Sequence, residues 1–260
     1  MEYGKGYTIG FATAVCLVCA VIVSSAAVGL RGRQEANAVL DRQKKVLLVA
    51  GLMEEGEAMD AAEVQKRFED SIKAVVVNLK SGLPAKGVDP ASFDQVAATK
   101  EPSTSQKAPA NAAKVKRLPN NALIYQVLKD GKLDMVVLPI EGKGLWSTLY
   151  GFLALDKDGD TIRGLTFYQH GETPGLGGEV DNPRWKAVWK GRKAYDAKGN
   201  PAIDIIKGPA PSAKEAPHKI DGLSGATLTC NGVEALVRFW IGENGFKNTI
   251  THIKKTGAVL

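Results

Sequence analysis

The sequence contains little cysteine and little histidine, and these shortages exclude several classes of protein. Two of its three cysteines, Cys16 and Cys19, lie inside an apolar run, where cysteines usually pack as small residues. Only Cys230 remains for the rest of the chain, so no intramolecular disulfide framework can form there. The three histidines have no metal-ligand spacing, and we expect no metal site.

Charged residues are missing from one N-terminal stretch. The 25 residues between Lys5 and Arg31 carry no charge, which is enough for a helix to cross a hydrocarbon core of about 30 Å. We predict a short tail at residues 1–8 and a transmembrane helix at 9–30. A cleavable signal peptide is the alternative, because small residues at 24–27 offer a cleavage site. The span has no ionisable residue to relay an ion, so the chain alone cannot be an ion channel.

Basic residues outnumber acidic ones, giving a net charge of +6, but they are spread along the chain. No predicted helix combines a basic stripe with aromatic residues, so we expect no nucleic-acid partner. Several Arg and Lys residues follow the apolar span, whereas only Lys5 precedes it. By the positive-inside rule alone, this asymmetry would place the following domain in the cytoplasm.

The part of the chain after the apolar span contains two kinds of segment, one with helical spacing of apolar residues and one without large apolar residues. Apolar residues recur at helical spacing over 36–53 and 60–79, so we predict that residues 31–98 form a helical, membrane-proximal part. Residues 99–117 contain no Ile, Leu or aromatic residue and are predicted to be an exposed loop.

Four strand-like runs follow, at 122–128, 135–140, 150–155 and 162–168, with Asp-Gly turns between them. A helix with one apolar face is predicted from about 232 to 241, ended by Gly242 or Gly245. We therefore expect an α+β fold in which residues 118–260 form an antiparallel sheet with flanking helices.

The turn with Asp156, Asp158 and Asp160 superficially resembles a calcium-binding loop. In an EF-hand, glycine and glutamate would stand where this chain has Thr161 and Phe167. We interpret the segment as a hairpin turn.

The first segment that could carry chemistry is 221–229 (DGLSGATLT), directly before the predicted helix. Unpaired backbone N–H groups and the helix dipole make such a start a natural anion site. The alternative is that Thr227 or Thr229 only caps the helix, since threonine caps are common.

The second segment is 170–179 (HGETPGLGGE), at the end of the fourth strand. Its glycines and proline allow the backbone to approach a flat ligand closely. The alternatives are a mobile surface turn and metal binding by His170 and Glu172. The H-x-E pattern of zinc deaminases also needs P-C-x-x-C, which this sequence lacks.

Together these segments resemble a known family. Ser224-Gly225-Ala226-Thr227, preceded by Asp221, is similar to the signature of FMN-binding domains in which a flavin transferase joins the FMN phosphate to the final threonine. With 170–178 and 142–147 (GKGLWS), essentially the whole chain resembles the C subunits of the Na⁺-translocating NADH:quinone reductases.

Two other interpretations stay open. The G subunits of Rnf electron-transport complexes share both segments, although this chain is longer and continues with 178–185 (GEVDNPRW). The alternative from another class is a cofactor-free, membrane-anchored binding or scaffolding domain.

The resemblance implies a role for individual residues. Thr227 would carry the phosphoester bond to FMN, and Lys207 would be either a cationic neighbour of the flavin or a surface lysine. The residues implied at the phosphate end are Asp221, Ser224, Gly225, Ala226 and Thr229. The residues implied around the isoalloxazine are Trp146, Ser147, Glu172, Thr173, Gly175, Leu176 and Gly177.

The resemblance also implies a function and a location. The chain would be a flavoprotein subunit that relays electrons one at a time within a Na⁺-translocating NADH:ubiquinone oxidoreductase. Its partners would be the other subunits of that complex and, during maturation, the flavin transferase. It would cross the bacterial inner membrane once with its soluble domain in the periplasm, against the charge count.

Overall fold

The computed structural model describes residues 4–257 and residue 260, and its contacts divide the chain into two units, 1–42 and 43–260. Within the first unit, the described residues form part of α1 (Lys5–Val49), a continuous helix that contains the predicted span 9–30. The predicted tail 1–8 is helical from Lys5 onward, and residues 1–3 lie outside the described part. The predicted helix 36–53 is the last part of α1 and ends at Val49.

Among the described helices, α1 is the one long and apolar enough to cross a membrane. Its most apolar window is fully exposed in the protein itself, with large side chains such as Phe11, Leu17 and Ile22 on its surface. A helix that is apolar all round needs a nonpolar environment, and lipid supplies one. The helix is therefore a candidate membrane span.

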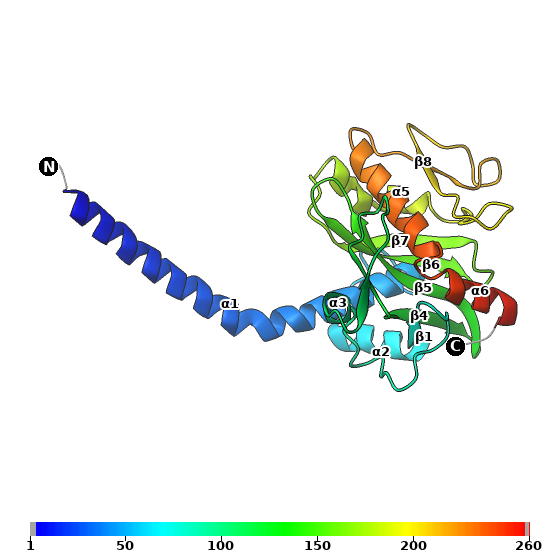
Figure 1. Ribbon diagram of the computed structural model, residues 1–260, viewed down its shortest axis with the longest axis horizontal. Coiled ribbons are helices and arrows are strands. Elements are labelled where there is room, and N and C mark those ends of the chain that lie inside the picture. Colours follow the sequence, from blue (N-terminus) through cyan, green and yellow to red (C-terminus); the bar gives the residue numbers. More distant parts are fainter. Residues whose placement is uncertain (1–3, 258–259) are drawn as a thin grey trace. The chain divides into compact units, whose positions relative to one another are not determined.

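The centre of the second unit is a five-stranded antiparallel sheet in the order β1-β4-β5-β6-β7 (Figure 1). The four predicted strands are all confirmed and extend slightly further than predicted. They are β4 (Asn121–Lys129), β5 (Lys132–Lys143), β6 (Thr148–Asp156) and β7 (Ile162–Gln169).

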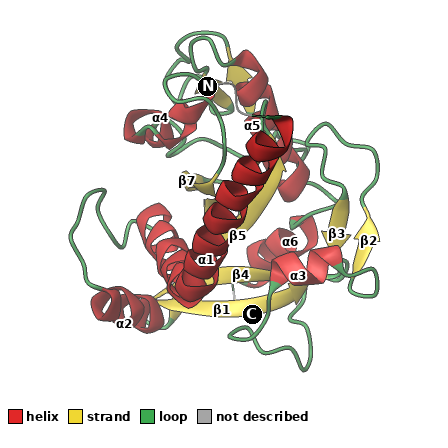
Figure 2. Ribbon diagram, turned by 90° about the vertical axis from the view of Figure 1, so that its left-hand side faces the viewer, coloured by secondary structure: helices red, strands yellow, loops and turns green. Residues whose placement is uncertain are grey.

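The prediction of one helix over 60–79 is wrong in its second half. Helix α2 (Ala61–Ser71) starts at a capping box between Asp60 and Glu63, and the chain then continues as β1 (Ile72–Asn78). The β-branched run 75–77 is buried, and β1 pairs along its whole length with β4, so tertiary pairing overrides the helical spacing. Figure 2 shows β1 and β4 side by side, with α2 close to one end of β1.

The predicted exposed loop 99–117 is also only partly correct. The segment starts in α3 (Gln95–Lys100), contains β2 (Ser105–Lys107), and ends in β3 (Arg117–Pro119), which pairs with β2. Ala113 and Val115 are buried, because small apolar side chains can pack where the composition suggested solvent exposure. Residues 43–260 form one unit, so the expected boundary at residue 118 does not separate two bodies.

Helices cover both faces of the sheet. Helix α5 (Thr227–Ile241) packs on β5, and a Cβ at Gly142 would collide with Leu236 of this helix. It begins five residues before the predicted start and ends at Gly242, as predicted. Successive side chains of a strand point to opposite faces of the sheet. By the β4–β5 register, Tyr125 lies on the face opposite α5, where its ring contacts Phe68 of α2 edge to face.

The remaining elements are short. They are η1 (Gly177–Asp181), α4 (Pro183–Ala187), β8 (Asp204–Ile206), β9 (Lys219–Asp221) and α6 (Lys247–Thr256). Strands β8 and β9 pair in parallel, and β9 leads directly into the segment before α5. This order places the end of β5, the loop after β7 and the start of α5 within reach of one another.

Candidate functional site

Three predicted segments meet at the carboxylate of Glu172. Its Oε1 accepts hydrogen bonds from the backbone N–H groups of Trp146 and Ser147, both at 3.0 Å, and from the Ser147 hydroxyl at 3.3 Å. Its Oε2 accepts from the Leu145 N–H at 3.1 Å and from the Thr229 hydroxyl at 2.7 Å. One side chain of the Gly-rich loop thus holds the β5–β6 turn and the first turn of α5.

Glu172 is only 5% exposed, and it keeps its negative charge there. Burial raises the pKa of its carboxyl, but the hydrogen bonds from Thr229, Ser147, Trp146 and Leu145 outweigh this and lower the pKa overall. No Lys or Arg within residues 4–257 forms an ion pair with it. Neutral donors alone therefore stabilise the carboxylate.

Glycines allow this close arrangement. A Cβ at Gly144 would lie 2.6 Å from Oε1 of Glu172, and one at Gly177 would lie 2.5 Å from Oγ1 of Thr229. Gly175 has a φ of +75°, in the left-handed region that other residues rarely adopt. Gly144 and Gly177 therefore allow the close packing around Glu172, and Gly175 allows the turn of the loop.

The loop 170–178 is held by its own hydrogen bonds. The Glu172 N–H donates to Nδ1 of His170 at 3.2 Å, and Nε2 of His170 lies 2.8 Å from Asp181. The Gly171 N–H donates to the Ser147 hydroxyl at 2.7 Å. Both ring nitrogens of His170 are engaged, and the described residues contain no group of three potential metal ligands. Metal binding through His170 and Glu172 gains no support from this geometry.

The start of α5 has no side-chain cap among the described residues, so the capping alternative is wrong for both threonines. The N-cap residue is Ala226, and the Thr229 hydroxyl donates to Glu172 instead. Thr227 is the first residue of the helix and is exposed. The first helical bond runs from the Cys230 N–H to the Ala226 carbonyl at 2.9 Å, which leaves the N–H groups of 227–229 without a helical acceptor.

Exposed apolar side chains surround this helix start. Trp146 is 67% exposed and Leu228 60%, and Leu145 and Leu176 are also exposed. These four come from the three segments that Glu172 joins, whereas the second unit exposes only two other large apolar side chains in its described part, Leu83 and Val96. Such a concentration of exposed apolar surface is typical of a binding site.

Leu176 brings two of the predicted segments together. Its Cδ2 would lie 3.0 Å from a Cβ at Gly225, whose φ is +71°. Thr173 contributes its backbone carbonyl, which accepts from the N–H groups of Leu176 at 3.1 Å and Gly178 at 2.9 Å. Ser224 is exposed beside Gly225.

Asp221 and Lys207 lie at the edge of this arrangement. One Asp221 carboxylate oxygen accepts from the Ala210 N–H at 3.0 Å, so the side chain holds the neighbouring segment. The Lys207 side chain is exposed, and its Cα would lie 3.7 Å from a Cβ at Gly222. The structure brings the backbone of Lys207 close to the predicted phosphate end.

Sequence reasoning missed four residues that shape the site. Leu145 donates to Glu172, and Leu228 exposes its side chain next to Thr227. Trp185 donates from Nε1 to the Asp221 carbonyl at 2.8 Å, and Cys230 accepts from the Leu223 N–H at 3.2 Å. Leu145 lies within the segment 142–147 that supported the resemblance, and Leu228 carried a signal as a large apolar residue between two threonines.

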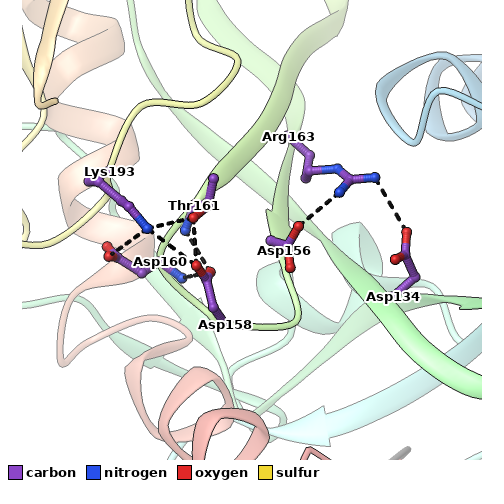
Figure 3. A network of polar contacts seen from close by, with 7 residues as sticks. All are labelled: Asp134, Asp156, Asp158, Asp160, Thr161, Arg163 and Lys193. Carbon is purple, nitrogen blue, oxygen red and sulfur yellow. Dashed lines mark hydrogen bonds and ion pairs between the residues drawn. The ribbon is translucent and has the colours of Figure 1, made fainter. Parts of the chain in front are cut away.

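The acidic turn considered as a calcium loop holds lysine and arginine side chains (Figure 3). Lys193 Nζ lies 3.3 Å from Asp158 and 3.5 Å from Asp160. Arg163 forms ion pairs with Asp156 at 2.8 Å and with Asp134 at 3.4 Å. Asp158 also accepts the N–H groups that follow it, as the hairpin-turn interpretation requires.

The region that contains the three segments resembles a known family of domains. Residues 144–242 match the model of the FMN-binding domain family, a range that includes 170–179, 221–229 and most of 142–147. The chain is 49% identical to the C subunit of the Na(+)-translocating NADH-quinone reductase of Pseudomonas aeruginosa, over 95% of both chains. It is 48% identical to the same subunit of Yersinia pestis, over 93% of this chain and 90% of that one.

A solved structure has the same fold. The crystal structure of NqrC from Shewanella oneidensis is similar with a TM-score of 0.76 and 36% sequence identity. The match covers 83% of this chain and 97% of that structure.

Proposed function

The chain belongs to the family of C subunits of the Na⁺-translocating NADH-quinone reductases, and from this premise we propose that Thr227 carries FMN through a phosphoester bond. Members of this family are subunits of an oxidoreductase complex, and this chain contains their FMN-binding domain. The observation that supports the covalent link is the exposed Thr227 hydroxyl at an uncapped helix start.

The residues around Thr227 fit a phosphate. The N–H groups of 227–229 lie in the first turn of α5, where the helix dipole favours negative charge. A phosphodiester keeps about one negative charge, which this position stabilises. Gly225 and Ser224 leave the approach to Thr227 open, since neither has a bulky side chain.

The exposed apolar side chains fit a flat ring system. Trp146, Leu176 and Leu228 would cover an isoalloxazine and keep water away from it. Glu172 fixes the backbone that carries Trp146 and the helix turn that carries Leu228. When bound, FMN supplies one-electron and two-electron redox chemistry, and the protein supplies position and shielding.

We assign the protein the role of an electron relay between redox centres of neighbouring subunits. Helix α1 would anchor it in the bacterial inner membrane with the second unit in the periplasm, where a flavin transferase attaches the flavin. A covalent link suits such a location, because a reversibly bound cofactor would be lost by diffusion. The relatives named above belong to the quinone reductase, so they do not favour the Rnf-type alternative.

The covalent link is tested with two threonine variants and one serine variant. The chain is co-produced with an active flavin transferase and run on a denaturing gel, where covalent flavin gives a fluorescent band. We expect Thr227→Ala to abolish the band, whereas Thr229→Ala retains some of it, because the Thr229 hydroxyl is directed toward Glu172. Ser212→Ala is the matched control for an exposed hydroxyl outside the three segments.

If the wild-type chain shows no fluorescent band although the transferase modifies another substrate, the covalent-flavin proposal fails and the cofactor-free scaffolding alternative remains. A band that persists in Thr227→Ala and disappears in Thr229→Ala would show that we have assigned the wrong threonine.

For the topology, a reporter active only in the periplasm is fused to the C-terminus. An inactive reporter, together with an active cytoplasmic one, would support the charge count instead.

A further inference from the structure

A pocket of about 510 Å³ lies where β5 ends and β6 begins, and several cationic side chains contribute to its lining. Its volume is in the range of small-molecule sites. The residues that line it are Thr99, Lys100, Lys114, Val115, Lys116, Arg117, Glu141, Gly142, Lys143, Thr148 and Tyr150. Five of them are Lys or Arg, and one is a carboxylate.

The cations of this pocket have no acidic partner in the part of the chain that the structure describes. Arg117 donates to the hydroxyl and the carbonyl of Ser105, and Lys143 donates to the Trp146 carbonyl at 2.7 Å. Elsewhere in the second unit, Arg67, Arg163 and Lys193 are paired with carboxylates. The pocket therefore concentrates positive charge that the protein itself does not neutralise.

The backbone holds these cations in place. The Asn111 side chain accepts from the Val115 N–H at 3.0 Å and donates to the Val115 carbonyl at 2.9 Å. Val115 is buried, so its neighbours Lys114 and Lys116 are directed outward on either side of it. Lys114 has a φ of 53°, a conformation uncommon outside glycine that is often found at functional sites.

The other lining groups suit an organic ligand. The ring of Tyr150 lies 6.2 Å from that of Tyr168, in a row of aromatic contacts, and offers a flat apolar wall. Glu141 is the one carboxylate of the lining, and burial raises the pKa of its carboxyl. An anionic ligand would thus meet several cations, an aromatic wall and a single carboxyl group.

We propose that this pocket binds a small organic anion with two or more phosphate or carboxylate groups. Two lining residues, Gly142 and Lys143, belong to the segment 142–147, but none of the exposed side chains around Thr227 lines this pocket, so the proposal does not depend on the flavin. An acidic peptide of a neighbouring subunit is the rival occupant. We favour the small anion because the cations line a concave space rather than a flat face.

The test uses the full-length chain in detergent, loaded with its flavin, and isothermal titration calorimetry. The probes are pyrophosphate for phosphate groups, citrate for carboxylate groups, and a hexaglutamate peptide for an acidic partner segment. We expect pyrophosphate or citrate to bind with a 1:1 ratio, and more weakly as the salt concentration rises. The flavin absorbance should not change on binding.

The variant for this test is Lys114→Gln combined with Lys116→Gln, two exposed residues whose loss should leave the fold intact. Loss of two contacting charges should weaken binding at least about tenfold. The matched control is Lys129→Gln combined with Lys132→Gln, which removes the same charge at the far end of the β4–β5 hairpin.

Specific binding that only the pocket variant weakens would support the proposal. Equal weakening in both double variants would show attraction by net charge alone and would overturn it. Absence of binding by pyrophosphate and citrate at millimolar concentration would do the same. Tighter binding of hexaglutamate than of either small anion would make the pocket a protein-docking site and contradict the small-ligand assignment.

Discussion

Two centres of the second unit stabilise a carboxylate in different ways. Glu172 is buried and is held by five neutral donors with no cation. Asp158 lies on a hairpin turn and shares Lys193 with Asp160, partly exposed to water (Figure 3). In the first centre no cation balances the negative charge, and in the second one lysine balances it in part.

This difference separates a buried joint between three segments from a partly exposed turn. At Glu172, neutral N–H and hydroxyl donors satisfy the carboxylate and hold the segments together. In the acidic turn, a lysine and an arginine pair with carboxylates and close the hairpin. We expect the two centres to respond differently to removal of charge, and the following predictions test that expectation in order of decreasing effect.

The largest effect is predicted for Glu172→Gln. The new amide would direct an NH₂ group toward donors that now face a carboxylate oxygen, and it would leave buried N–H groups without acceptors. We expect the free energy of unfolding to fall by about 2 to 3 kcal/mol. Thermal and urea unfolding of the detergent-solubilised chain measure this, and Glu243→Gln, an exposed glutamate on the same unit, is the matched control.

The pH dependence sharpens this prediction. The pKa of Glu172 is lowered in the folded state, so its stabilisation is present above its ordinary value of 4.5 and is lost as the pH falls through the folded value. The difference between wild type and Glu172→Gln should therefore be constant near neutral pH and shrink in acid. A difference that grows on acidification would contradict an ionised Glu172.

A smaller effect is predicted for Asp158→Asn. Burial raises the pKa of Asp158, but hydrogen bonds from Thr161, Asp160 and Lys193 lower it to about 2, from an ordinary value of 3.8. Its contribution to stability is present above pH 3.8 and is lost as the pH falls toward 2. Since solvent screens this exposed group, we expect a loss of about 1 kcal/mol at neutral pH.

Thermal unfolding at several pH values measures this change, with the exposed Asp204→Asn as the control. If Asp158→Asn cost as much as Glu172→Gln, the distinction between the two centres would fail.

The smallest effect is predicted for Lys193→Gln. This lysine is partly exposed, and exposed ion pairs contribute about 0.5 kcal/mol or less each. The loss should decrease further at high salt, because salt screens exposed charges. Unfolding at low and high salt measures it, and Lys190→Gln is a matched lysine without a carboxylate partner among the described residues. A salt-independent loss of several kcal/mol would show that Lys193 is essential for the hairpin.

The sequence was sufficient to predict the elements that depend on local pattern. The four central strands are short apolar runs, and Asp130-Gly131 and Asp158-Gly159 mark two of their three reversals. Strand β1 was missed because Val64, Phe68, Ile72 and Val75 fit a helical spacing as well. The segment forms a strand because it pairs with β4, which is far away in the sequence.

The candidate site could likewise be predicted only in part. The Gly-rich loop and the helix start were predicted as separate segments, and the family resemblance connected them. What the sequence could not show is that Glu172 accepts from Leu145, 27 residues before it, and from Thr229, 57 residues after it. Such contacts depend on how the sheet and α5 pack, which no local pattern encodes.

The wide spacing of the Glu172 partners also sets an order of events during synthesis. Strand β1 leaves the ribosome without its partner β4, and 42 residues separate the two strands in the chain. The carboxylate of Glu172 cannot complete its set of hydrogen bonds until α5 has been made and has folded onto β5. Any group that needs all three segments can therefore be attached only after α5 has folded onto β5.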